Sequence, residues 1–286
     1  MSIRRLERVI PSVATSDGAG VKLRRSLGAS RNQRLDPFLM LDEFGTDRPE
    51  DYIAGFPPHP HRGFETVTYM LDGHMRHEDH LGNVGELKSG GVQWMTAGRG
   101  IVHSEMPQQE EGRMRGFQLW INLPAKEKMK PASYRDIPAE EIPQVALADG
   151  GRVKVIAGRF EQDGETTAGA ITGLSTEPVF VDVELPANGH FEHGLPEGHN
   201  AFVYAYEGEL QIAGDEPRPL QRQHAGILSK GDRVEVGAGE DGARFILLAG
   251  KPIDEPVVQY GPFVMNTMQE IEQALREYRE GTLTGA

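Results

Sequence analysis

The sequence predicts an all-β fold of two tandem jelly-roll barrels, closed by one short C-terminal helix. Three observations predict this fold class. The 286 residues include 35 glycines and 19 prolines, a content that suits many strands joined by turns. Apolar and polar residues alternate in short runs along the chain. The runs of the first half recur in the second half with related turn spacings, as expected for a double-sheet jelly roll.

Each expected strand is followed by a Gly, Asn or Pro that can form a turn. With these turn residues included, they cover residues 65–73, 75–83, 92–100, 117–124, 152–158, 201–214, 233–239 and 243–250. Between the two halves, Pro138–Glu141 is expected to form a single helical turn.

The stretch Met268–Glu280 is the one longer helix that the sequence predicts. Thr267 and Glu270 have the spacing of a capping box, and Gly281 follows as a stop signal. One face carries the apolar residues Met268, Ile271, Leu275 and Tyr278. We expect this stripe to pack against a sheet, because burial of such a face supplies most of a helix's stability.

An internal repeat organises the chain. Glu65–Met75 matches Asn200–Leu210, and Glu86–Gly98 matches Ile227–Gly239 in the spacing of its glycines. Unequal loop lengths between the two copies are expected. The predicted domains are a metal-binding barrel at 1–135, a linker at 136–150, and a second barrel with the terminal helix at 151–286.

Two histidine-containing pairs in the first half predict a metal site. His59 and His61 are two residues apart, and so are His103 and Glu105. Side chains at this spacing point to the same face of a strand. Two adjacent strands could therefore direct three imidazoles and one carboxylate at a single ion.

The ligand types bear on the choice of metal. Imidazole suits several transition metals, and a carboxylate oxygen favours a harder ion. Three His and one Glu would fill four octahedral positions and leave two open. We expect one divalent transition metal, first Fe(II), with Mn, Ni, Cu and Zn as alternatives. Because the chain has no cysteine, thiolate sites and iron–sulfur clusters are excluded.

The bulk properties exclude several other classes of function. A formal net charge of −13 argues against direct binding to nucleic acid. No segment approaches the roughly 20 apolar residues of a membrane-spanning helix. The first residues lack the apolar core of a secretory signal, so a cytoplasmic location is expected. A monomer is the expected oligomeric state.

The motifs around these histidines resemble the pirin family of double-cupin proteins, including bacterial pirin-like quercetin 2,3-dioxygenases. GFPPHPHRGFETVTYMLDG and GGVQWMTAGRGIVHSEMP carry the resemblance, supported by FLMLDEFG, GFQLWINLP and GPFVMNT. The resemblance implies a bicupin whose N-terminal barrel holds the metal and whose C-terminal barrel is degenerate. It places His59, His61, His103 and Glu105 on the family's iron ligands.

Glu65 is an alternative carboxylate. In cupins generally, the carboxylate ligand comes from the first motif, shortly after the second His. Glu65 is four residues past His61 and in phase with it on a strand. The resemblance favours Glu105, and Glu65 could instead hold an imidazole N–H.

The repeat also predicts what the second half lacks. Its matches place Gly194 and Pro196 opposite His59 and His61, and Arg244 and Ile246 opposite His103 and Glu105. Every ligand is therefore expected to be missing there.

The remaining histidines carry no predicted chemistry. His74, His77 and His80 are expected on a solvated hairpin, because their spacings do not share one strand face. His190, His193, His199 and His224 have no matching spacing. Near the motifs, the aromatic or apolar residues Phe56, Trp94, Met95 and Phe117 are expected in the barrel core or lining a pocket for a flat ligand.

Three functions follow from this site. The first is a dioxygenase that cleaves a flavonol such as quercetin with O2, with Glu105 as the catalytic base for the flavonol hydroxyl. The second is a pirin-like redox sensor that binds a transcription factor or a metabolic enzyme. The third is a fold that a metal stabilises without turnover.

Overall fold

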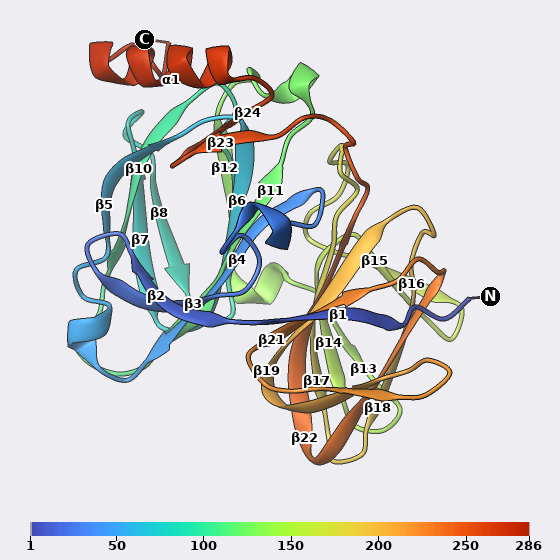
Figure 1. Ribbon diagram of the computed structural model, residues 1–286. Coiled ribbons are helices and arrows are strands. Elements are labelled where there is room, and N and C mark those ends of the chain that lie inside the picture. The colour runs from blue at the N-terminus through green and yellow to red at the C-terminus, as the bar shows by residue number, and fades with distance from the viewer. Residues whose placement is uncertain (1, 286) are drawn as a thin grey trace. The chain divides into compact units, whose positions relative to one another are not determined.

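The structure, a computed structural model, describes residues 2–285 and consists of two compact units, each assembled from three segments of chain (Figure 1). The first barrel comprises Ala14–Gly28, Phe38–Ala139 and Ile253–Ala286. The second barrel comprises Met1–Val13, Ala29–Pro37 and Glu140–Pro252. The all-β fold class with one C-terminal helix is confirmed.

The first barrel contains a seven-stranded sheet in the order β12-β9-β6-β11-β4-β3-β2 and a four-stranded sheet in the order β5-β10-β7-β8. The larger sheet consists of β2 (Val13–Asp17), β3 (Val21–Arg25), β4 (Phe38–Thr46), β6 (Phe64–Asp72), β9 (Val92–Thr96), β11 (Met114–Asn122) and β12 (Ser133–Ile137). The smaller sheet consists of β5 (Phe56–His61), β7 (His74–Asp79), β8 (Val84–Lys88) and β10 (Ile101–Pro107).

The second barrel is one nine-stranded sheet in which β18 pairs with β22 and β20 pairs with β19 beside the main order β1-β21-β19-β22-β17-β14-β13. Its strands are β1 (Leu6–Pro11), β13 (Gln144–Ala146), β14 (Arg152–Ala157), β17 (Val179–Leu185), β18 (His190–Gly194), β19 (Asn200–Ile212), β20 (Arg218–Leu220), β21 (His224–Leu228) and β22 (Arg233–Gly250). A separate hairpin joins β15 (Arg159–Gln162) and β16 (Glu165–Ala168).

The two barrels share one strand topology, which confirms that the chain contains two copies of one fold. The match of Glu65–Met75 with Asn200–Leu210 agrees with β6 and β19, whereas the match of Glu86–Gly98 with Ile227–Gly239 is wrong, because β9 corresponds to β21. The order β12-β9-β6-β11-β4-β3-β2 corresponds position by position to β1-β21-β19-β22-β17-β14-β13. In the second barrel, the long strand β19 takes the place of both β6 and β7, and β22 takes the place of both β10 and β11. The 136–150 stretch contains the 3-10 turn Ala139–Glu141, where a single helical turn is expected, and strand β13.

Helix α1 (Met268–Glu280) has the predicted bounds and the predicted caps. Thr267 and Glu270 form the capping box, and Gly281 ends the helix with a φ of 72°. The expected apolar stripe is only partly buried: Ile271 is fully buried, whereas Met268 and Tyr278 are exposed. The buried face instead combines Ile271, Ala274 and Leu275, which pack with β23 (Val258–Tyr260) and β24 (Phe263–Met265).

Buried hydrogen bonds tie the helix to the strand that carries His61. The Arg62 guanidinium donates to the Glu277 carboxylate and to the Leu283 carbonyl, and Arg62 is only 2% exposed. Within residues 2–285, no helix combines the length and apolar character needed to traverse a lipid bilayer.

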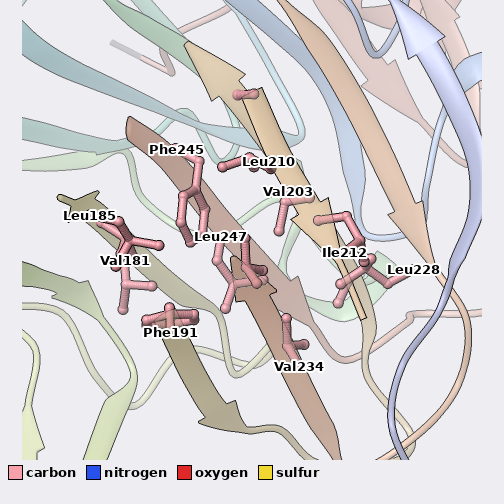
Figure 2. Close-up of a cluster of buried hydrophobic side chains, with 14 of the residues drawn as sticks. Val181, Leu185, Phe191, Val203, Leu210, Ile212, Leu228, Val234, Phe245 and Leu247 are labelled. Carbon is pink, nitrogen blue, oxygen red and sulfur yellow. The ribbon is translucent and has the colours of Figure 1, made fainter. Parts of the chain in front are cut away.

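Apolar side chains fill the interior of the second barrel (Figure 2). Branched and aromatic residues from β17, β18, β19 and β22 converge there, as expected for strands whose inward positions alternate with outward ones. The labelled members are Val181, Leu185, Phe191, Val203, Leu210, Ile212, Leu228, Val234, Phe245 and Leu247.

The strand register corrects the predicted correspondence between the two barrels. In the first barrel, His59 on β5 lies opposite His103 on β10. In the second barrel, His193 on β18 lies opposite Val234 on β22. His103 and Val234 are each three residues after a glycine with a positive φ. The two φ angles are nearly equal, at 154° for Gly100 and 157° for Gly231.

His193 therefore occupies the position of His59, and the expectation that every ligand is missing is wrong at this one position. The predicted counterpart Gly194 is one residue out of register, and a one-residue slip turns a side chain to the other face. The predicted counterparts Arg244 and Ile246 lie where β22 pairs with β17 instead. The sequence match placed Arg244 and Ile246 wrongly because it aligned Gly231 with Gly90, whereas the structure aligns Gly231 with Gly100.

His193 should make folding sensitive to acid. Burial lowers its pKa from 6.5 to about 4. Between these values the unfolded chain binds a proton that the folded chain does not, so stability is lost as the pH falls. We expect wild type to lose about 3 kcal/mol from pH 7 to pH 4 relative to His193→Leu. Urea unfolding of both proteins across this range measures the difference, and parallel curves would contradict the assignment.

Candidate metal centre

Three histidines from two paired strands form a close cluster. β5 and β10 are antiparallel neighbours in the smaller sheet (Figure 1). His59 lies directly opposite His103, and His61 is the last residue of β5. One nitrogen of each of the three rings lies within 4.8 Å of the others. His61 and His103 are 3% and 2% exposed, and His59 is half-buried. The predicted convergence of the three imidazoles is present.

Burial keeps two of these imidazoles neutral. The pKa values of His61 and His103 lie well below 6.5, first because burial penalises the charged ring and then because neighbouring histidines disfavour a further charge. None of their four ring nitrogens has a hydrogen-bond partner of good geometry in the described protein, although the Pro262 backbone lies close enough to His61 to oppose part of its pKa shift. Neutral imidazoles with free lone pairs are what a transition metal binds.

His59 is oriented by its own strand. Its Nδ1 lies 2.8 Å from the Pro57 carbonyl oxygen, and because a carbonyl only accepts, Nδ1 carries the proton. Nε2 is then left as the metal-binding nitrogen. A hydrogen bond that fixes the tautomer in this way is common at metal-ligating histidines.

Glu105 lies beside the histidine cluster but is not among its mutually close ligand atoms. It is 5% exposed and accepts a hydrogen bond of 3.0 Å from the Thr68 hydroxyl. The ladder between β5 and β10 shifts register between His103 and Glu105, which pairs with Phe56. Such a bulge re-aims the side chains that follow it. The ligand role of Glu105 stays a prediction.

Glu65, the alternative carboxylate, is bound by other groups. Its two oxygens accept hydrogen bonds from Thr96 Oγ1 at 2.7 Å and from Trp94 Nε1 at 3.2 Å. Lys130 Nζ lies 3.9 Å away. Burial raises the pKa of Glu65, which is 1% exposed. None of these partners is an imidazole, so these contacts hold Glu65 within the sheet β6–β9.

A cavity of about 570 Å³ adjoins the cluster. His59, His61 and Glu105 line it together with Phe56 and Trp120. Its volume is within the range of small-molecule sites, and the aromatic walls suit a flat apolar ligand. Of the four residues weighed for such a pocket, Phe56 lines the cavity, whereas the core assignment is confirmed for Trp94, Met95 and Phe117, which are at most 4% exposed.

The lining of the cavity also includes an ion pair. The Arg25 guanidinium donates to both carboxylate oxygens of Asp42, at 2.8 and 2.7 Å. Asp42 is 2% exposed and Arg25 is half-buried. A bidentate pair of this kind is a rigid polar group.

The structure adds His77 to the site, which the sequence analysis placed on a solvated hairpin. His74 and His80 are half-buried and exposed there, but His77 is 2% exposed. Its ring centroid lies 4.8 Å from that of His103, and its strand position is opposite Glu105. The sequence did carry a signal for the burial of His77. Met75 and His77 alternate with the charged residues Arg76 and Glu78, as expected for a strand with one buried face.

A hydrogen-bonded chain orients His77. Gln93 Nε2 donates to Asp136 Oδ1 at 2.7 Å, so Gln93 Oε1 is left to accept from His77 Nδ1. The ring of Tyr134 stacks on His77 at 4.9 Å. These contacts fix the tautomer, with the unprotonated nitrogen at Nε2. That atom has no partner in the described protein.

We expect Gln93→Leu to destabilise the protein by about 1–3 kcal/mol, because it leaves a buried imidazole N–H without an acceptor. Gln144→Leu, on the exposed strand β13, is the matched control and should change stability by less than about 0.5 kcal/mol. Urea unfolding measures both. Equal values for the two variants would contradict the proposed orientation of His77.

The three imidazoles should bind one divalent metal. Metal analysis of wild type should give about one equivalent per chain, and His61→Ala should lose it. At a hundredfold excess over the dissociation constant, binding should add about 3 kcal/mol of stability. His190→Ala, at an exposed position of the second barrel, should bind metal as wild type does. Full metal occupancy in His61→Ala would contradict the cluster's role.

Comparison with known proteins places the chain in a family. The family models for Pirin and for the Pirin C-terminal cupin domain match residues 20–121 and 180–284. A Pseudomonas aeruginosa protein that is named, provisionally, a quercetin 2,3-dioxygenase is 58% identical over 268 residues, covering 94% of each chain. Human pirin is 43% identical over 268 residues, covering 92% of this chain and 88% of its own.

A solved structure has the same fold over the whole length of this chain. The crystal structure of a quercetin 2,3-dioxygenase from Acinetobacter baumannii has a TM-score of 0.90 and 34% sequence identity. It covers 100% of this chain, and 99% of its own length is matched. With two matching domain models and full-length relatives, the chain belongs to the pirin family of double-cupin proteins.

Proposed function

We propose that the protein is a metal-dependent dioxygenase that cleaves the ring of a flavonol, such as quercetin, with O2. The observation that carries the proposal is the cluster of His59, His61 and His103 beside a cavity with aromatic walls. Relatives named for quercetin 2,3-dioxygenase activity support the same reaction class.

The histidine cluster fits a resident metal. Two of its rings are buried, neutral and without hydrogen-bond partners, which would be costly unless an ion bound them. His59, His61 and His103 would hold the ion, with Glu105 as the fourth ligand, and Fe(II) is the expected metal ahead of Mn, Ni, Cu and Zn. When bound, the metal would supply Lewis acidity and coordination positions for substrate and O2.

Glu105 is the group proposed to move a proton. Its carboxylate would accept the proton of the flavonol 3-hydroxyl, so that the substrate reacts as its anion. Thr68 donates to Oε1 of Glu105 and leaves Oε2 free for this role. Thr68 Oγ1 also lies against Gln118, which lines the cavity. These contacts restrict the rotation of a carboxylate that a bulge has already turned.

The cavity walls would orient the flat substrate. Trp120 lies against His61 at 5.4 Å and against Phe64 at 4.4 Å between ring centroids. This packing fixes the indole as an apolar wall directly beside the metal ligands. Phe56 lines the cavity at the other end of β5. A planar ring bound between such walls excludes water from the reacting carbon atoms.

Glu105→Gln tests the proton acceptor. It keeps the side chain's size but removes the base, so kcat for flavonol cleavage should fall about 10²- to 10⁴-fold. Oxygen uptake on a panel of flavonols, with metal content measured on the same samples, checks this. The matched control is Glu65→Gln, which changes the alternative carboxylate and should retain both metal and activity.

Each outcome of this experiment decides a separate point. Wild-type turnover in Glu105→Gln would contradict its role as base. Turnover in metal-free His61→Ala protein would contradict a metal-dependent reaction altogether. Metal binding by wild type without oxygen uptake on any flavonol would refute the proposed substrate and favour a regulatory or purely stabilising role for the metal.

A further inference from the structure

A second cavity, of about 600 Å³, lies within the second barrel. Its apolar walls are formed by Leu174, Pro178, Val179, Leu195 and Pro196, and polar and charged residues also line it. The volume is within the range of sites that enclose a small organic molecule. The histidine cluster of the first barrel contributes no residue to this cavity.

A buried imidazole without a hydrogen-bond partner is among the polar groups that line this cavity. His193 lines it, is 3% exposed, and has no hydrogen-bond partner at either ring nitrogen in the described protein. Its ring stacks on Phe160 with the centroids 5.1 Å apart, which holds it in place. Burial lowers the pKa of His193 to about 4, so the ring is neutral near pH 7. A neutral imidazole offers one donor and one acceptor.

The charged groups of this cavity disfavour an anion. Glu161, Glu177 and Asp232 line it, against the single cation Arg159. His199 also lines it and is neutral, because burial lowers its pKa in spite of Glu177, whose Oε2 lies 3.6 Å from Nε2. A carboxylate or phosphate would therefore meet net repulsion.

A metal ion is also a poor match for this cavity. By strand register, His193 has the place of His59, but Val234 has the place of His103. Leu195, two residues after His193, has the place of His61. Among the described residues, the cluster of at least three metal-binding side chains lies in the first barrel. The cavity therefore has His193 at the position of His59, with His199 also in its lining, and lacks counterparts of His61 and His103.

We propose that this cavity binds a small uncharged molecule that carries a hydroxyl on an apolar ring, a simple phenol in its minimal form, with the hydroxyl on His193. A hydroxyl both donates and accepts, so it can pair with either nitrogen of the neutral ring. The apolar walls bury the ring carbons. This binding does not depend on the proposed dioxygenase reaction.

The test compares phenol with toluene, which has a similar shape but no hydroxyl. Both are titrated by calorimetry into the metal-loaded protein, and the site is located by amide chemical shifts. Wild type should bind phenol about five- to tenfold more tightly than toluene, as one net hydrogen bond predicts. Phenol should shift the amides of Thr172, Gly173 and Leu174.

Two substitutions at His193 separate recognition from folding. His193→Leu should abolish the preference for phenol but still bind toluene, whose binding also reports an intact cavity. His193→Gln retains a donor and an acceptor and should keep most of the preference. Loss of both probes to the same extent in both variants would overturn the proposal, and so would an unchanged preference in His193→Leu.

A variant of the first barrel is the control for phenol binding at the cavity beside the histidine cluster. His61→Ala should leave the phenol preference and the shifts near Leu174 unchanged. Phenol shifts confined to the first barrel, for example at Gly261, would overturn the proposal. Zinc uptake by His61→Ala that disappears on adding His193→Leu would also overturn it, because the cavity would then be a metal site.

Discussion

The antiparallel pairing of β5 with β10 is the constraint on which the candidate site depends. Because His59 and His103 are opposite each other in this ladder, backbone hydrogen bonds bring their rings together before any metal binds. His61 joins them from the same face of β5, since it is two residues further along. Burial in the barrel then keeps the rings neutral and ready to donate lone pairs. A shift of one residue in this pairing would turn one strand's ligands away from the other's.

The two barrels show how one topology supports different interiors. At the register positions of His59 and His103, the second barrel has His193 and Val234. Val234 belongs to a continuous apolar cluster, which needs no ligand to offset the cost of buried polar groups (Figure 2). The first barrel instead buries imidazoles whose nitrogens lack protein partners. The second barrel also has a cavity, but of the three clustered histidines of the first barrel only His59 has a counterpart there, His193.

Each barrel is completed by a distant terminal segment. The N-terminal strand β1 pairs with β21 in the second barrel, and residues 253–286 belong to the first barrel. Arg62, directly after His61, is held by Glu277 and Leu283 from that C-terminal segment. The buried ammonium of Lys128 adds bonds to Gly63 at 2.7 Å and to Val264 at 3.1 Å. The end of the metal-ligand strand is therefore stabilised by contacts that close only when the C-terminal segment is in place.

Local sequence patterns were sufficient to predict the fold class, the bounds and caps of α1, and the grouping of His59, His61 and His103. These features are predictable because strand alternation and helix capping each depend on residues only a few positions apart. The burial of His77, its orientation by Gln93 and Asp136, and the bonding of Glu65 to Thr96 and Trp94 required the tertiary structure. The correspondence of His193 with His59 required it too, since loops of unequal length obscure the register. Which strands become neighbours, and which residues then face one another, depends on contacts between positions far apart in the chain, and no short pattern encodes these.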